Sequence, residues 1–262
     1  MYRANYHTHG QWCNHGTGEE KEFVKEALKA EVWQIGFSEH LPFPDNRLYR
    51  MDFSQLPDYT SKVYELREKC ESGIRMFCGG EIEYFPEMKS YYRYLVEDGG
   101  FHYLILGQHY FKHGEAVQRT KKLEETKEIL NYAYSIREAL ETGSFKILAH
   151  PDYFGYVDFE VDGNIEKAID VIIEAAVETN TLLEVNANGF RKPCFQSKLG
   201  MRRRYPLDCF WARAAEKKAK VIIGSDCHAN GCLYDEAVKQ CEKYILDKKL
   251  NQIKHNVMFL GD

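Results

Sequence analysis

Residues 221–228 read VIIGSDCH, an apolar run followed directly by a carboxylate and an imidazole. The run 221–225 predicts a buried strand, because short apolar segments rich in β-branched residues favour that structure. Asp226 and His228 then emerge at the carboxyl end of the strand, and two residues apart in an extended chain their side chains point the same way. An aspartate after a strand can also cap the next helix, so this segment alone leaves both interpretations open.

Strand-like segments alternate with helical patterns along the whole chain. Further strands are expected at residues 3–7, 36–38, 75–81, 103–106, 146–150 and 182–186. Helices are expected at residues 55–72, 123–142, 207–217 and 234–246, around the apolar stripe at 165–176, and after a capping box at 17–20. This alternation is typical of a parallel sheet with helical crossovers.

Side chains that can bind metals fall at the carboxyl ends of these strands. They are His7, His40, Glu81, His109, His150, Asn186 and Asp226. In a closed barrel those ends meet at one mouth, where the loops build the active site. In an open doubly wound sheet the outermost of them would lie too far apart to share a site. We therefore predict a single α/β domain over residues 1–262, with a closed barrel favoured over the open sheet.

The composition narrows the classes of function. The 262 residues carry a formal net charge of -5, and the only notable basic cluster is MRRR at 201–204, which argues against a nucleic-acid binder. The eight cysteines form no CxxC pair, the N-terminus shows no apolar signal region, and no stretch reaches the ~20 apolar residues of a membrane span. We expect a cytoplasmic protein with reduced thiols and no membrane partner.

The expected strand ends combine imidazoles with carboxylates and no paired thiolates. His7 and His9 alone are weak evidence, because surface histidines often show the same spacing. The coincidence of six such motifs at one topological position favours a shared catalytic site for Zn, Mn or Fe. Such metals produce a hydroxide nucleophile near neutral pH and neutralise phosphoryl oxygens.

The ordered motifs resemble those of the polymerase-and-histidinol-phosphatase (PHP) superfamily from residue 7 to residue 228. They read HTH at 7–9, SEH at 38–40, GE at 80–81, QH at 108–109, AHPD at 149–152 and SDCH at 225–228. His15, FSEH at 37–40 and NANGFRKP at 186–193 are most similar to the monofunctional histidinol-phosphatases. The resemblance implies a distorted (β/α)7-type barrel with its active site at the C-terminal ends of the strands. It also implies hydrolysis of L-histidinol phosphate to L-histidinol and phosphate in histidine biosynthesis.

The resemblance further implies three divalent metal ions. One would be held by His7, His9, Glu81 and Asp226, a second by Glu81, His109 and His150, and a third by His15, His40 and His228. A metal-bound hydroxide would attack phosphorus, with Asp226, His228 and Arg191 as catalytic residues. His15 stands in a polar loop, where a plain surface position is the alternative.

Arginines are the expected phosphate ligands, because a guanidinium fork matches phosphate oxygens. Arg191, Arg203 and Arg204 are the candidates, although the tract 202–204 could equally be a solvated basic loop. His113 could face the substrate or solvent. Asp152 could orient a ligand histidine or only close a turn. The expected partner is a small phosphate ester.

Three alternatives stay open. The substrate could be another small phosphate ester or a nucleotide. The chain could be a non-catalytic PHP module, although such domains tend to lose ligands. An unrelated barrel hydrolase acting on amide or ester bonds is the third, which a bridging carbamylated lysine would favour, and no lysine stands at an expected strand end.

Overall fold

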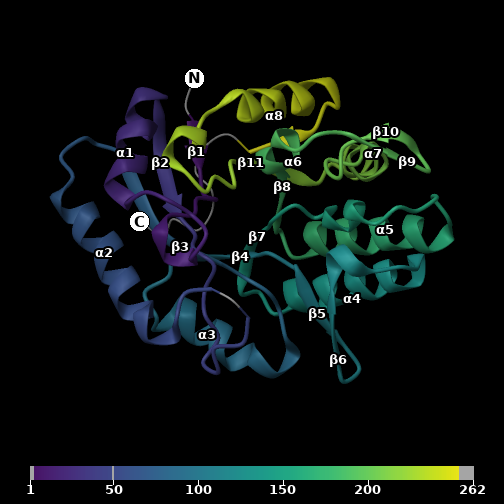
Figure 1. Ribbon diagram of the computed structural model, residues 1–262, viewed down its shortest axis with the longest axis horizontal. Helices are drawn as coiled ribbons and strands as arrows, with labels where there is room; N and C mark the ends of the chain where they lie inside the picture. Colours follow the sequence, from purple (N-terminus) through teal and green to yellow (C-terminus); the bar gives the residue numbers. More distant parts are fainter. Residues whose placement is uncertain (1–2, 49, 254–262) are drawn as a thin grey trace.

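The computed structural model describes residues 3–48 and 50–253 (Figure 1). Its main sheet has the strand order β1-β2-β3-β4-β7-β8-β11-β12, and every neighbouring pair is parallel. The strands are β1 (Arg3–Asn5), β2 (Val32–Phe37), β3 (Arg75–Ile82), β4 (Tyr103–Leu106), β7 (Phe145–Leu148), β8 (Leu182–Asn186), β11 (Lys220–Gly224) and β12 (Asn251–Gln252). The spatial order therefore follows the chain order, as right-handed helical crossovers between parallel strands favour.

Helices surround this sheet (Figure 1). They are α1 (Glu20–Lys29), α2 (Leu56–Lys69), α3 (Lys89–Glu97), α4 (Thr126–Glu141), α5 (Gly163–Glu178), α6 (Ala187–Arg191), α7 (Asp208–Glu216) and α8 (Glu236–Asp247). Two antiparallel hairpins lie outside the main sheet: β5 (Tyr110–His113) with β6 (Ala116–Arg119), and β9 (Phe195–Ser197) with β10 (Gly200–Arg202). In the described ranges, no helix combines the length and apolar character needed to cross a bilayer.

Alternation along each strand divides the core into an outer and an inner part. In β4, Leu104 and Leu106 belong to the large cluster beneath the helices, whereas Tyr103 and Ile105 belong to a smaller cluster with Tyr6. Successive side chains of a strand point to opposite faces, so the smaller cluster fills the inside of the curled sheet. The sheet thus encloses a packed interior with its polar residues at one end.

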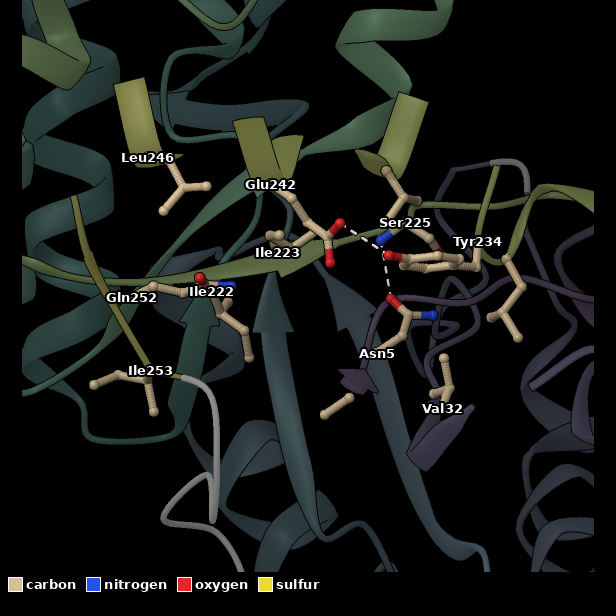
Figure 2. Close-up of a pocket in the computed structure, with 13 residues that line it drawn as sticks. Asn5, Val32, Ile222, Ile223, Ser225, Tyr234, Glu242, Leu246, Gln252 and Ile253 are labelled. Atoms are coloured by element: carbon tan, nitrogen blue, oxygen red, sulfur yellow. Dashed lines mark hydrogen bonds between the residues drawn. The ribbon is translucent and has the colours of Figure 1, made fainter. Parts of the chain in front are cut away.

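Among the described residues, the curled sheet closes at its carboxyl end. Thr8 and Cys227 form an isolated parallel bridge, and the His9 amide donates to the Cys227 carbonyl at 2.9 Å. Side chains from β1, β11, β12 and α8 line a separate, mostly apolar cavity of about 230 Å³ (Figure 2). Seven strands surround the interior and β12 extends the sheet beyond β11, so the predicted distorted (β/α)7-type barrel is confirmed.

Several element boundaries differ from those expected. Strand β2 begins at Val32 rather than residue 36, because the polar Gln34 is buried and accepts a hydrogen bond from the Tyr6 hydroxyl. Helix α1 begins at Glu20, where Glu19 rather than Thr17 forms the capping box. Helices α3 and α6 and both hairpins were not predicted, because their segments are short and lack a clear period.

Candidate metal centre

Nine predicted ligands converge at the closed end of the barrel. His7 and His9 follow β1, His40 follows β2, Glu81 lies in β3, His109 follows β4, His150 follows β7, and Asp226 and His228 follow β11. His15 joins them from the loop before α1. Parallel strands bring these positions together because their carboxyl ends share one rim.

The carboxylate of Glu81 lies at the centre of the cluster. Its Oε2 atom lies 3.3 Å from both His7 Nε2 and His9 Nε2, and 3.0 Å from His40 Nδ1. The Oδ1 atom of Asp226 lies 3.9 Å and 3.7 Å from the same two Nε2 atoms. The donor atoms of His7, His9 and Asp226 are close enough to share one ion.

The second oxygen of Glu81 faces a different pair of histidines. Oε1 lies 3.7 Å from His109 Nε2 and 3.3 Å from His150 Nε2. Gly107 makes room for it, because a Cβ atom there would lie 2.0 Å from Oε1. The two oxygens of Glu81 therefore face two different groups of candidate ligands.

A third group forms at the outer side of the cluster. His228 Nε2 lies 3.0 Å from His15 Nε2, and the ring of His40 stacks on that of His15 at 5.1 Å. The donor atoms of His9, His40 and His228 also lie within reach of a single ion. His15 is exposed, as expected for a surface loop, yet its ring faces the cluster.

The electrostatics of the cluster suit metal ligation. Burial would raise the pKa of Glu81 and Asp226, but the surrounding histidines outweigh it and hold both values far below the usual range. Burial lowers the pKa of His9 to about 3 and that of His40 well below normal. For His7 burial is outweighed by Glu184, Glu81 and Asp226, which raise its pKa. Ionised carboxylates and neutral imidazoles are the forms that bind metals, so Glu81, Asp226, His9 and His40 are ready for ligation, whereas His7 must give up a proton when a cation binds.

Several buried side-chain atoms of the candidate ligands lack a hydrogen-bond partner. Within the described chain, His9 Nδ1, His40 Nδ1, His150 Nδ1 and Glu81 Oε1 have no hydrogen-bond partner. Most buried polar atoms of proteins have one. The other ring nitrogen of His9 and of His150, Nε2, lies close to Glu81, and the other oxygen of Glu81, Oε2, lies close to His9 and His40. The mixed nitrogen and oxygen donors are typical of a catalytic site for Zn, Mn or Fe, whereas a structural zinc site usually has thiolate ligands.

The cluster forms the floor of a cavity of about 470 Å³. Its other walls carry Arg50, Arg119, Lys121, Lys192, Tyr153 and Tyr205. Arg50 pairs with Glu83 at 2.8 Å, whereas the Lys121 ammonium lies over the ring of Tyr156 at 4.5 Å. No ion pair joins Arg119 or Lys121 to a carboxylate within the described residues, so both are available to an anion.

Two predicted phosphate ligands do not reach this cavity. Arg191 donates to Asp235 at 2.8 Å and to the carbonyls of Ser225 and Cys232 at 2.6 and 2.8 Å. Arg203 donates to the carbonyls of Phe190 and Lys192, both at 3.0 Å. These guanidinium groups hold loops together, and the structure does not bring them to the cavity that the candidate ligands line.

The remaining candidates divide. His113 lies on the β5–β6 hairpin beside a different surface hollow and is not brought to the cluster. Arg204 packs over the rings of Tyr156 and Phe195 and is not among the residues that line the cavity. Asp152 orients no ligand histidine through its side chain: it accepts from the Leu207 amide and the Trp211 indole at 2.6 and 2.9 Å.

Two carboxylates beside the ligands were missed. Glu184 Oε1 lies 2.6 Å from His7 Nδ1, and Glu83 Oε1 lies 3.1 Å from His109 Nδ1. The available signal was position: Glu184 shares a strand face with Asn186, and Glu83 stands two residues after Glu81. Arg119, Lys121 and Lys192 carried no such signal, because none of them follows a strand of the main sheet directly: Arg119 ends the hairpin strand β6, Lys121 lies in the turn after it, and Lys192 follows α6.

Residues 5–188, more than half of the chain, match the PHP domain family. This chain belongs to that family. The chain is 25% identical over 247 residues to a protein of Deinococcus radiodurans named probable histidinol-phosphatase, and the match covers 89% of this chain and 90% of that protein. It is 22% identical to the histidinol-phosphatase of Bacillus subtilis, and this match covers 92% of this chain and 100% of that protein.

The chain also resembles a solved structure. This is the histidinol phosphate phosphatase of Lactococcus lactis in complex with zinc, L-histidinol and phosphate, with a TM-score of 0.72 and 16% identity. The match covers 97% of this chain and 96% of the other. At this identity the likeness shows the fold, and it agrees with the barrel described above.

Proposed function

We propose that this PHP domain is a metal-dependent phosphomonoesterase that hydrolyses L-histidinol phosphate to L-histidinol and phosphate. The observation that carries the proposal is Glu81, whose two oxygens face separate sets of histidines on the floor of a cavity with unpaired cations. The names of the relatives support the choice of ester. We further propose one domain over residues 1–262, working in the cytoplasm on a small-molecule substrate.

The proposed ligand sets follow the three groups of side chains. His7, His9, Glu81 and Asp226 would hold one divalent ion, Glu81, His109 and His150 a second, and His15, His40 and His228 a third. Bound metals would lower the pKa of water and absorb phosphoryl charge. Asp226 stays ionised, so it serves as a ligand or base rather than an acid.

The cations on the opposite wall complete the phosphate site in this proposal. Arg119 and Lys121 would contact phosphoryl oxygens directly, in place of Arg191 and Arg203, and Arg204 would add positive potential from behind. Tyr153 and Tyr205 line the same cavity and would contact the imidazole of the leaving group. His228, whose pKa is lowered by burial, would remain neutral, as a metal ligand must be, and the leaving alkoxide would take up a proton from water.

Phosphate release tests the proposal. Metal-free protein is supplied with Zn²⁺, Mn²⁺ or Fe²⁺, and histidinol phosphate is compared with phosphoserine, glycerol 3-phosphate and AMP. We expect activity only with metal, and the highest kcat/KM for histidinol phosphate. Glu81→Gln should lose activity, whereas Glu138→Gln, half-buried and outside the cavity, should not.

The other outcomes are equally informative. Equal kcat/KM values for all esters would leave a generic phosphatase. Full activity without metal would remove the metal centre from the reaction. Bound metal without hydrolysis of any ester would favour a non-catalytic module.

A further inference from the structure

Glu184 is a buried carboxylate in the middle of the parallel sheet. It lies in β8 with 1% of its surface exposed, and its chain neighbours Leu183 and Val185 pack on the opposite face beneath the helices. No lysine or arginine forms an ion pair with it in the part of the chain that the structure describes. Burying a carboxylate without a cationic partner is costly, so its place calls for a function.

The contacts of Glu184 join three candidate ligands from three strands. Its Oε1 atom lies 2.6 Å from His7 Nδ1, and its Oε2 atom accepts from the His150 amide at 3.1 Å. Oε2 also accepts at 2.7 Å from the Asn186 amide group, which donates at 3.1 Å to Asp226 Oδ2. One carboxylate thus connects the segments after β1, β7 and β11.

Gly224, which has no side chain, provides the space that the Glu184 carboxylate occupies. A Cβ atom on Gly224 would lie 1.6 Å from Glu184 Oε1, so any larger residue there would push the carboxylate away from His7. Gly224 pairs with Asn186 across the β8–β11 ladder, which fixes this close approach. The placement therefore depends on two neighbouring strands.

The hydrogen bond to Glu184 determines how His7 can bind a metal. A proton on Nδ1 directed at Glu184 leaves Nε2 to point at the cluster, where it lies 2.9 Å from His9 Nε2 and 3.3 Å from Glu81 Oε2. The other tautomer would place a proton on the atom that faces the cluster. A carboxylate behind an imidazole also makes it a stronger ligand.

We propose that Glu184 is a positioning residue of the metal centre, which orients His7 and strengthens it as a metal ligand. The inference rests on the proposed metal centre and does not depend on the identity of the ester. Glu184 itself touches no substrate in this account. Its effect should appear in metal affinity before it appears in turnover.

Metal affinity measured without substrate tests this inference. The dissociation constant of Zn²⁺ is obtained by chelator competition for the parental protein, Glu184→Gln and Glu184→Ala. Glutamine keeps an acceptor but removes the charge, so we expect affinity to fall about 10- to 100-fold, as for other partners of metal-bound histidines. Alanine should weaken binding further. Activity of Glu184→Gln should recover at high metal concentration.

Glu20→Gln is the matched control. Glu20 is also buried, and it accepts from the Trp12 indole at 2.7 Å without touching a candidate ligand. It should leave the zinc dissociation constant unchanged, and thermal unfolding of the metal-free variants will show whether each is folded. Parental affinity in folded Glu184→Gln, or an equal loss in Glu20→Gln, would overturn the inference. Absence of zinc binding by the parental protein would instead refute the proposed metal centre.

Discussion

The Nε2 atoms of His15 and His228 lie 3.0 Å apart, although 213 residues separate them in the chain. Two backbone contacts produce this approach. The Thr17 amide donates to the His228 carbonyl at 2.8 Å, and His15 Nδ1 lies 2.7 Å from the Cys13 carbonyl. The second contact assigns the proton to Nδ1 and leaves the Nε2 lone pair free to bind a cation beside His228.

Replacing His15 should therefore remove one metal ion without unfolding the barrel. In His15→Asn we expect the weakest metal site to lose affinity by at least about tenfold, since a lost ligand should cost no less than a lost orienting partner. Metal content per chain after dialysis, together with phosphate release, measures the effect. His113→Asn is the control, because His113 is also exposed but lies outside the cavity. Equal metal content in both variants would contradict the assignment of His15.

A second prediction concerns the space beside Glu81. In Gly107→Ala the new methyl group would lie 2.0 Å from Glu81 Oε1 and must displace the carboxylate from His109 and His150. We expect a loss of stability of about 1–3 kcal/mol from overpacking, together with weakened metal binding. Urea unfolding of the metal-free protein and a zinc titration separate the two effects. Gly163→Ala, with open space around the glycine, should show neither.

The strand ends could be predicted because the architecture fixes them. Apolar runs such as Ile222 and Ile223 identify a buried strand, and in a parallel barrel the residue that follows it must reach the common rim. Asp226 and His150 were found in this way. The order of the motifs then gave the family, which composition and periodicity alone would not have done.

The positions of Arg191, Lys121 and Glu184 depend on contacts between segments that are far apart in the chain. Arg191 looked like a phosphate ligand because it follows a ligand-bearing strand, but the short helix α6 turns it toward Asp235. Lys121 enters the cavity only because the β5–β6 hairpin returns the chain there. Glu184 is recognisable only when His7 is seen against it. No fixed interval between residues in the sequence signals any of these three contacts.

The reassignment of Arg191 leads to a third prediction. Arg191→Gln should lower stability by about 1.5–3 kcal/mol, because hydrogen bonds to the Asp235 carboxylate and two carbonyls are lost. Asp235 also caps α8, so the helix should become less stable. The KM for phosphate esters should change much less than in Lys121→Gln. Urea unfolding and steady-state kinetics on the folded variants decide this, and a large rise in KM with parental stability would restore the sequence-based role.

The last prediction uses the ionisation of Lys121. Although the residue as a whole is exposed, its ammonium lies 4.5 and 5.2 Å from the rings of Tyr156 and Tyr153. Burial, followed by repulsion from Lys192 and Arg119, lowers its pKa to about 8. The cation is therefore present at pH 7 and is lost as the pH rises through 8. If it binds phosphate, KM should rise above pH 8, by about tenfold for the loss of one charged hydrogen bond.

Two variants separate Lys121 from other groups that titrate in this range. Lys121→Arg keeps its charge at every accessible pH, so the rise in KM should disappear. Lys121→Gln should show the raised KM already at pH 7 and no further change attributable to this position. Water bound to a metal also titrates near neutral pH, but its effect would persist in both variants. A KM profile in Lys121→Arg identical to that of the parental enzyme would show that the Lys121 ammonium does not bind the phosphate.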